Sequence, residues 1–252
     1  MSHLLEVKNL DVKFDTDEGQ ITAVENISLS VDEGEVLGIV GESGSGKSVT
    51  AKSIMQLNPG NTSYNENAEI ILDNENVLKF NSKEDLKKIR GGKVSMIFQE
   101  PMASFAPAIK IGSQMVEQLL IHKKINKDEA KSISVNMLKR VGIADAEKRF
   151  NQYAFELSGG MRQRAMIAMA LSTMPKLLLA DEPTTALDVT IQAQVINLIK
   201  DIIKEYQMGV IFITHDLGVI AQVADQVAVM YLGSIVEKGP VNEILKNPKH
   251  PY

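Results

Sequence analysis

Short runs of apolar residues recur along the chain and alternate with longer stretches in which apolar residues repeat every three to four positions. The short runs are almost continuously apolar and rich in β-branched residues, which is typical of strands covered on both faces. The longer stretches are typical of amphipathic helices. This alternation predicts an α/β fold with a helix-covered sheet. The expected strands are 36–40, 94–98, 177–180, 210–214 and 226–230, and the expected helices are 47–57, 161–172, 190–206 and 217–224.

Two segments depart from this alternation. Residues 4–31 alternate around polar turns, which predicts an antiparallel β layer packed beside the main sheet. Residues 109–149 are helical and charged without an apparent buried strand, which predicts an inserted helical subdomain. We therefore expect one domain over residues 1–252. Its core and β layer would occupy 1–102 and 156–252, and its helical subdomain about 103–155.

Composition narrows the functional classes. The chain has 252 residues, 44% hydrophobic and 23% charged, which is typical of a globular protein with a substantial core. The net charge of -5 argues against a dedicated nucleic-acid-binding protein. The sequence contains no cysteine, which excludes disulfides, thiolate metal sites and cysteine-held iron–sulfur clusters. A cytoplasmic location fits this composition.

The first residues show no basic segment followed by a long apolar run, so they do not resemble a secretory signal. No window holds the roughly 18 uncharged apolar residues that a membrane-spanning helix needs. We therefore expect any connection to a membrane to go through a partner.

The strongest chemical signal is the glycine-rich segment after the expected strand 36–40. Gly41-Glu-Ser-Gly-Ser-Gly-Lys47-Ser48 fits the phosphate-binding pattern GxxxxGK[ST]. Its glycines let successive N–H groups point at phosphates, and the following helix adds its positive end. Lys47 would reach the β and γ phosphates, and Ser48 would offer its hydroxyl to Mg²⁺. By chance this pattern would occur in about 1% of chains of this length. Its position between an expected strand and an expected helix favours a real phosphate-binding site. The predicted nucleotide-binding residues here are Gly41, Glu42, Ser43, Gly44, Ser45, Gly46, Lys47, Ser48 and Val49.

Two carboxylates end the expected strand 177–180. Successive side chains at the end of a strand point in different directions, so the two carboxylates can have different roles. We assign Asp181 to Mg²⁺ and Glu182 to polarising the attacking water. Alone, the pair would be better explained as an exposed acidic strand end. The phosphate loop reverses that preference.

A third segment, Leu157-Ser158-Gly159-Gly160-Met161, precedes an apolar-periodic helix. Ser158 is a candidate N-cap, and the glycines would expose backbone N–H groups to an anion. In isolation this pattern would indicate only a capped helix.

With these motifs the chain resembles the ATP-binding subunits of ABC transporters. The resemblance rests on GESGSGKS, Gln99 after KVSMIF, LSGGMRQR, LLLADEP, TALD and ITHD, in the order of that family over nearly the whole chain. It implies a phosphate-loop NTPase (RecA-like) core that uses ATP and Mg²⁺. It also implies a head-to-tail pair of subunits, each ATP lying between the phosphate loop of one and the signature 157–161 of the other.

The resemblance gives roles to residues that would otherwise pass as ordinary surface side chains. It implies that Gln99 approaches Mg²⁺ and the attacking water, that His215 contacts the γ phosphate, and that Asp188 lies at the dimer seam. Phe14 occupies the place where this family supplies an aromatic ring for adenine, and stacking there is physically reasonable. The alternative is core packing, which is common for a phenylalanine in an opening strand.

Longer strings, among them ADEPTTALDVTIQAQ and the final NPKHPY, resemble the peptide and nickel importer branch. That resemblance implies a paralogous ATPase as partner, or a second copy of this chain, together with two integral membrane permeases and, indirectly, an extracytoplasmic solute-binding protein. It implies a peripheral position at the cytoplasmic face of the cell membrane and no nucleic-acid partner. Ser104-Phe-Ala-Pro107 stands where many relatives read SLNP, which leaves the substrate subgroup open. Relatives commonly continue past this point, so we expect a longer natural chain.

Three alternatives accompany the peptide importer. One is a nickel or metallophore importer of the same branch. Another is a soluble ABC ATPase of DNA maintenance or translation, for which we would expect long coiled coils or tandem ATPase domains. The last is a binding module with a dead site, which the presence of Lys47, Asp181, Glu182 and His215 disfavours.

Overall fold

The computed structural model describes residues 3–184 and 189–252. Its main sheet has six strands in the order β11-β10-β3-β9-β8-β7. Five of them run parallel, and β11 pairs antiparallel with β10 at one edge. The strands are β3 (Val36–Val40), β7 (Val94–Ile97), β8 (Leu177–Asp181), β9 (Gly209–Ile213), β10 (Gln226–Tyr231) and β11 (Ser234–Pro240).

The central strands are apolar on both faces because each face belongs to a different core. Val210 and Phe212 of β9 belong to one buried cluster, whereas Ile211 and Ile213 belong to the other. This period of two is the pleat of a strand that is covered on both sides. Every residue of β3, β8 and β9 is buried.

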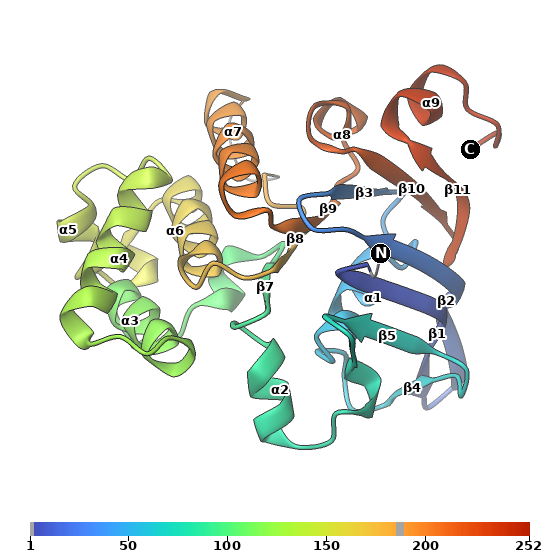
Figure 1. The fold of residues 1–252 in the computed structure, drawn as a ribbon, viewed down its shortest axis with the longest axis horizontal. Helices are drawn as coiled ribbons and strands as arrows, with labels where there is room; N and C mark the ends of the chain where they lie inside the picture. Colours follow the sequence, from blue (N-terminus) through green and yellow to red (C-terminus); the bar gives the residue numbers. More distant parts are fainter. Residues whose placement is uncertain (1–2, 185–188) are drawn as a thin grey trace.

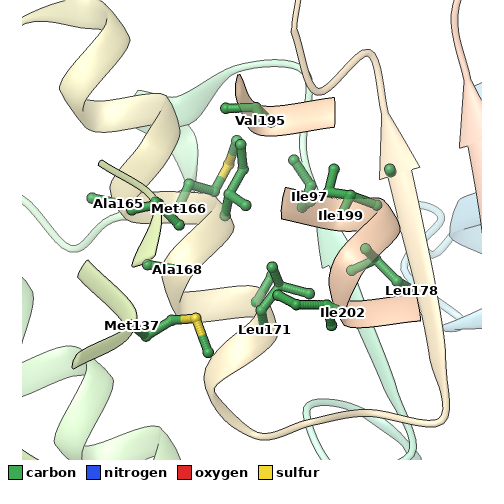
Figure 2. Close-up of a cluster of buried hydrophobic side chains, with 14 of the residues drawn as sticks. Ile97, Met137, Ala165, Met166, Ala168, Leu171, Leu178, Val195, Ile199 and Ile202 are labelled. Carbon is green, nitrogen blue, oxygen red and sulfur yellow. The ribbon is translucent and has the colours of Figure 1, made fainter. Parts of the chain in front are cut away.

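Helices α6 (Gly159–Ser172) and α7 (Val189–Tyr206) cover one face of the sheet. Figure 2 shows Leu171 of α6 and Ile199 and Ile202 of α7 beside Leu178 of β8. Met137 reaches the same cluster from α4 (Lys127–Arg140). The apolar stripe predicted for residues 190–206 therefore faces the sheet.

The opposite face carries α1 (Lys47–Ile54) and the antiparallel β layer. Leu5, Val7 and Ile27 of the layer share the second core with Ile54 of α1 and Ile211 of β9. The layer is a sheet of order β2-β1-β5-β6, with β4 also pairing with β1. Its strands are β1 (Leu5–Thr16), β2 (Gly19–Val31), β4 (Thr62–Tyr64), β5 (Glu69–Leu72) and β6 (Glu75–Asn76).

A helical layer flanks the β7 and β8 edge (Figure 1). It contains α3 (Ile111–His122), α4 and α5 (Ala146–Phe150). Asn126 opens α4 with a capping box, in which its side chain accepts from the N–H of Glu129 at 2.9 Å. Gly112 in α3 lies against the ring of Phe150, where an added Cβ would collide. The boundaries of this subdomain stay a prediction.

The remaining elements are short. They are α2 (Lys83–Ile89), α8 (Leu217–Val223), α9 (Val241–Lys246) and the 3-10 turns η1 (Val77–Lys79), η2 (Pro101–Ser104) and η3 (Ala154–Glu156). No helix within the described ranges is both long and apolar enough to cross a membrane.

The predicted fold class is confirmed, and so are the five core strands and four helices named from the sequence, with small differences at their ends. The largest difference is at α1, which ends at Ile54 instead of residue 57, because Gln56 adopts a left-handed φ of 50°. Helix α6 begins at Gly159 instead of residue 161, because Ser158 caps it there. The sequence analysis missed β4, β5, β6, β11, α2 and α9.

Candidate nucleotide site

The predicted chemical residues gather at the carboxyl ends of the parallel strands. Gly41 follows β3, Gln99 follows β7, Glu182 follows β8, and His215 follows β9. Parallel strands end at the same edge of a sheet, and in open α/β sheets this edge is where ligands bind. Residues far apart in the sequence thereby form one site.

Two positions of the phosphate loop accept only glycine for reasons of space. A Cβ on Gly41 would collide with the carbonyl oxygen of Met230, and one on Gly46 would lie 2.7 Å from that of Ala23. Gly46 also has a φ of 98° as the N-cap of α1. The loop is therefore wedged between β10 and the β layer, with its backbone near the helix N-terminus that favours an anion.

Lys47 is held inside this loop. Its ammonium donates to the carbonyl oxygens of Gly41 and Glu42, each at 2.7 Å, and the residue is only 6% exposed. Burial lowers the pKa of the ammonium, against the opposing charges of Glu182 and Asp181. The third donor makes a longer bond of 3.5 Å to the hydroxyl of Ser45, and this weak bond is the one that a phosphate could replace.

Asp181 is a buried carboxylate with unused coordinating capacity. It is 3% exposed, and its Oδ1 is buried without a hydrogen-bond partner. Burial raises its pKa, whereas a hydrogen bond from Ser48 and the charges of Lys52 and Lys47 act the other way. A hard cation such as Mg²⁺ would satisfy this oxygen, so the donors present fit a magnesium ion.

Few protein groups could share that ion. Among the residues that the structure describes, no group of three or more His, Asp or Glu side chains could hold a metal. This fits the usual Mg²⁺ site of nucleotide enzymes, in which one or two protein oxygens act together with phosphate and water oxygens.

Glu182 lies between the two other predicted catalytic side chains. The amide nitrogen Nε2 of Gln99 donates to one carboxylate oxygen at 3.3 Å, and Nδ1 of His215 lies 3.3 Å from the other. The Glu182 side chain is 14% exposed and that of His215 is 64% exposed. The structure thus brings Gln99, Glu182 and His215 together at one edge of the site.

The backbone of Glu182 is unusual. Its φ of 48° lies in the left-handed region, which a glutamate adopts only when its surroundings impose it. Its N–H donates to the carbonyl of Ile213 at 2.9 Å, which continues the β8–β9 pairing by one more residue. This bond ties the backbone of Glu182 to β9, the strand that His215 follows.

The signature segment opens α6 as predicted. Ser158 caps the helix by accepting from the N–H of Met161 at 3.3 Å, and Leu157 before it is buried. A Cβ on Gly159 would meet no atom within 4 Å, so space remains in front of this helix end. Figure 1 shows α6 beside the helical layer, far from α1 and its phosphate loop. Within one chain the signature and the phosphate loop stay apart.

One predicted residue, Phe14, stands outside this arrangement. Phe14 is half-buried and packs against the second core cluster, next to Ile21 and Thr62 on neighbouring strands. Its role toward adenine stays a prediction. Asp188 lies outside the described residues.

The sequence analysis missed two contacts with the site. The hydroxyl of Tyr252 accepts from the N–H of Glu42 at 2.9 Å, and the side-chain amide of Gln163 in α6 donates to the carbonyl of Pro183. Gln163 stands within the quoted signature string, but spacing alone gave no hint of its partner. Tyr252 lies 210 residues from Glu42, so no local pattern could have indicated that pair.

The fold and this arrangement of lysine, buried aspartate and strand-end glutamate define a phosphate-loop nucleotide hydrolase. The family model described as ABC transporter matches residues 24–185. The oligopeptide transport ATP-binding protein OppD of Bacillus subtilis is 52% identical over 252 residues, which are 100% of this chain and 70% of that protein. The dipeptide transport ATP-binding protein DppD of Lactococcus lactis is 50% identical over 99% of this chain and 71% of that protein.

Solved structures agree. The dimeric ATP-binding cassette MJ0796 bound to ADP and Pi superposes with a TM-score of 0.84 at 27% identity, over 94% of this chain and 98% of that one. CbiO1 from Clostridium perfringens, part of an ABC transporter complex, gives 0.79 at 27% identity, over 98% and 92%. The chain belongs to the ABC transporter family, and it is an ATP-hydrolysing subunit of that family.

Proposed function

We propose that this chain hydrolyses ATP to power the import of peptides through an ABC transporter. The observation that carries the hydrolytic part is Glu182, placed between Gln99 and His215 at 3.3 Å from each. The importer part is supported by the relatives at about half identity over the whole chain, which are oligopeptide and dipeptide transport proteins.

The residues divide the reaction as follows. Lys47 and the loop 41–49 bind the β and γ phosphates, and Phe14 stacks on adenine. Ser48, Asp181 and Gln99 would hold Mg²⁺, which would neutralise developing charge on the phosphate oxygens. Glu182 accepts a proton from a water molecule while the oxygen of that water forms a bond to the γ phosphorus. The bond from that phosphorus to the bridging oxygen breaks, and ADP and phosphate result.

His215 has two possible partners in this scheme. In the structure its Nδ1 lies beside the carboxylate of Glu182, and its side chain is mostly exposed. An exposed imidazole can turn from the carboxylate toward an incoming γ phosphate without disturbing the fold. We propose that it contacts the γ phosphate when ATP is bound.

A complete site requires a second subunit. The signature 157–161 faces outward and stays apart from the loop of its own chain. We propose a head-to-tail pair, with the signature of each subunit closing the ATP site of the other and Asp188 at the seam. The partner is a paralogous ATPase, or a second copy in a homodimer. The pair would attach to two membrane permeases at the cytoplasmic face and serve a solute-binding protein indirectly.

The peptide assignment is tested by co-expression with the permeases and the solute-binding protein encoded beside this chain. The ligand that copurifies with that binding protein identifies the cargo. A bound peptide supports the proposal, and a bound nickel complex or metallophore replaces it with the alternative importer. Isolation of the chain in a soluble complex with ribosomes or DNA, without membrane subunits, would contradict the transport role.

A further inference from the structure

One peptide unit of the phosphate loop is held from both sides. The carbonyl of Gly41 and the N–H of Glu42 belong to the same peptide unit, since they flank the same C–N bond. The carbonyl accepts from the ammonium of Lys47 at 2.7 Å, and the N–H donates to the hydroxyl of Tyr252 at 2.9 Å. The orientation of this peptide plane therefore depends on a lysine of α1 and on a tyrosine 210 residues away in the sequence.

Tyr252 reaches the loop at the tip of an anchored segment, residues 247–252, which we call the strap. The carboxylate of Glu237 in β11 accepts from the N–H of Lys249 at 3.0 and 3.1 Å and from that of His250 at 2.9 Å. The N–H of Tyr252 donates to Nδ1 of His250 at 3.2 Å. These bonds fix the end of the strap against β11, the outer strand of the main sheet.

The aromatic ring fixes the direction of the hydroxyl. The ring of Tyr252 packs against that of Tyr231 at the end of β10, with centroids 4.8 Å apart and planes tilted by 40°. Between the strap and the loop lies an apolar cavity of about 420 Å³, lined by Val40, Val229, Ile244 and Pro248 among others. The strap thus covers this cavity and contacts the phosphate loop through the side-chain hydroxyl of Tyr252.

We propose that Tyr252 is a positioning residue for ATP binding, acting through the Gly41–Glu42 peptide on Lys47. A hydrogen bond to the N–H of a peptide polarises its carbonyl and strengthens the bond which that carbonyl accepts. Two protons of the Lys47 ammonium are held by loop carbonyls at 2.7 Å, and the third makes only a long bond of 3.5 Å to the hydroxyl of Ser45. That third proton is the one that a phosphate oxygen would take over. The inference rests on the proposed role of Lys47 in phosphate binding.

The test compares MgATP affinity of the purified full chain in three variants. Tyr252→Phe removes the hydroxyl and keeps the ring. Tyr231→Phe removes a hydroxyl from the other ring of the same pair and is the matched control. Glu237→Ala removes the anchor of the strap and leaves Tyr252 itself intact. The melting temperature of each nucleotide-free variant and the exchange rate of the Glu42 amide are measured in parallel.

We expect Tyr252→Phe to weaken MgATP binding roughly 3- to 10-fold, the value of one modest hydrogen bond. Glu237→Ala should shift affinity in the same direction, and Tyr231→Phe should stay within about twofold of the wild type. The Glu42 amide should exchange faster in Tyr252→Phe and Glu237→Ala, with melting temperatures close to the wild type. ATPase activity is also measured in the assembled transporter. There we expect Tyr252→Phe to raise the KM for ATP and to leave kcat unchanged.

Three outcomes would overturn the inference. One is an unchanged affinity in Tyr252→Phe. Another is an equal loss in Tyr231→Phe, which would assign the effect to ring packing. The last is an affinity loss that only follows a lowered melting temperature. Lys47→Ala tests the phosphate site separately from the role of Tyr252. Unchanged MgATP binding in Lys47→Ala would contradict the assignment of the phosphate site, whatever the result for Tyr252→Phe.

Discussion

The carboxylate of Glu182 lies 3.3 Å from Nδ1 of His215, and the two residues follow neighbouring parallel strands. The other carboxylate oxygen accepts from Gln99, so the group is oriented on both sides. A carboxylate oriented in this way at the end of a buried strand is well placed to take a proton from one water molecule.

Glu182→Gln should therefore remove hydrolysis and keep ATP binding. The amide preserves the shape of the side chain but cannot accept the proton, so we expect turnover in the assembled complex to fall about 100-fold or more. Because the step after binding is blocked, the ATP-bound dimer should accumulate. Gel filtration with ATP and a phosphate-release assay measure both effects, and wild-type turnover in the variant would refute the role of Glu182.

Lys47→Ala should act on binding itself. It removes the one ammonium that the loop carbonyls of Gly41 and Glu42 hold in place. Loss of a charge-assisted bond to phosphate is expected to weaken ATP affinity roughly 10- to 100-fold. A nucleotide titration checks this, with Lys52→Ala as a control that removes an ammonium from the last turn of the same helix.

Asp181→Asn should separate stability from metal binding. Burial raises the pKa of Asp181, so at neutral pH its ionised form disfavours the folded, nucleotide-free chain. We expect the neutral amide to raise the melting temperature by roughly 2–4 °C, equivalent to about 1 kcal/mol. Mg²⁺-dependent ATP binding should weaken at the same time. A lowered melting temperature together with unchanged Mg²⁺ dependence would contradict both expectations.

The same pair of proteins should respond differently to pH. As pH falls through the raised pKa of Asp181, the wild-type carboxyl takes up a proton in the folded state and its destabilising effect is lost. The difference in melting temperature between Asp181→Asn and the wild type should therefore shrink toward acid pH and vanish below 3.8, the ordinary pKa of the group. Thermal melts over a pH series measure it, and a gap that is constant with pH would argue against the buried charge as its cause.

Ser158→Ala should destabilise α6 without affecting ATP binding to the isolated chain. The hydroxyl of Ser158 caps the helix at Met161, and losing an N-cap costs about 1 kcal/mol. We expect a drop of roughly 2–4 °C in melting temperature. Because we propose that the signature closes the ATP site of the partner subunit, we expect turnover to fall only in the assembled pair. Loss of ATP affinity in the isolated chain would indicate that the signature acts within its own subunit.

The parts of the fold that could be predicted are those with a strong local pattern. Strands such as 36–40 and 177–180 are apolar on both faces, and the phosphate loop and the Ser158 cap are read from a few adjacent residues. The short strands β4 and β6 have too few residues to show a period. The edge strand β11 is mostly half-exposed and carries glycine and proline, so its sequence resembles a loop.

The residues that meet at this edge of the sheet could be named from the sequence, but their contacts could not. Motifs named Gln99, Glu182 and His215, yet only the parallel order of β7, β8 and β9 brings the three together. The pairing of Tyr252 with Glu42 depends on the path of the strap after α9, which has no local sequence signal. The left-handed backbone of Glu182 is likewise imposed by its surroundings and is not typical of its residue type.

The most direct test of the central claim is ATP-driven peptide uptake by proteoliposomes that contain the complete transporter with this chain. ATP is supplied on the side of the bilayer that carries this chain, and the peptide and its solute-binding protein on the other side. We predict that the peptide is taken up, and that no uptake occurs when this chain carries Glu182→Gln. Equal uptake by the wild-type and Glu182→Gln transporters would contradict the account.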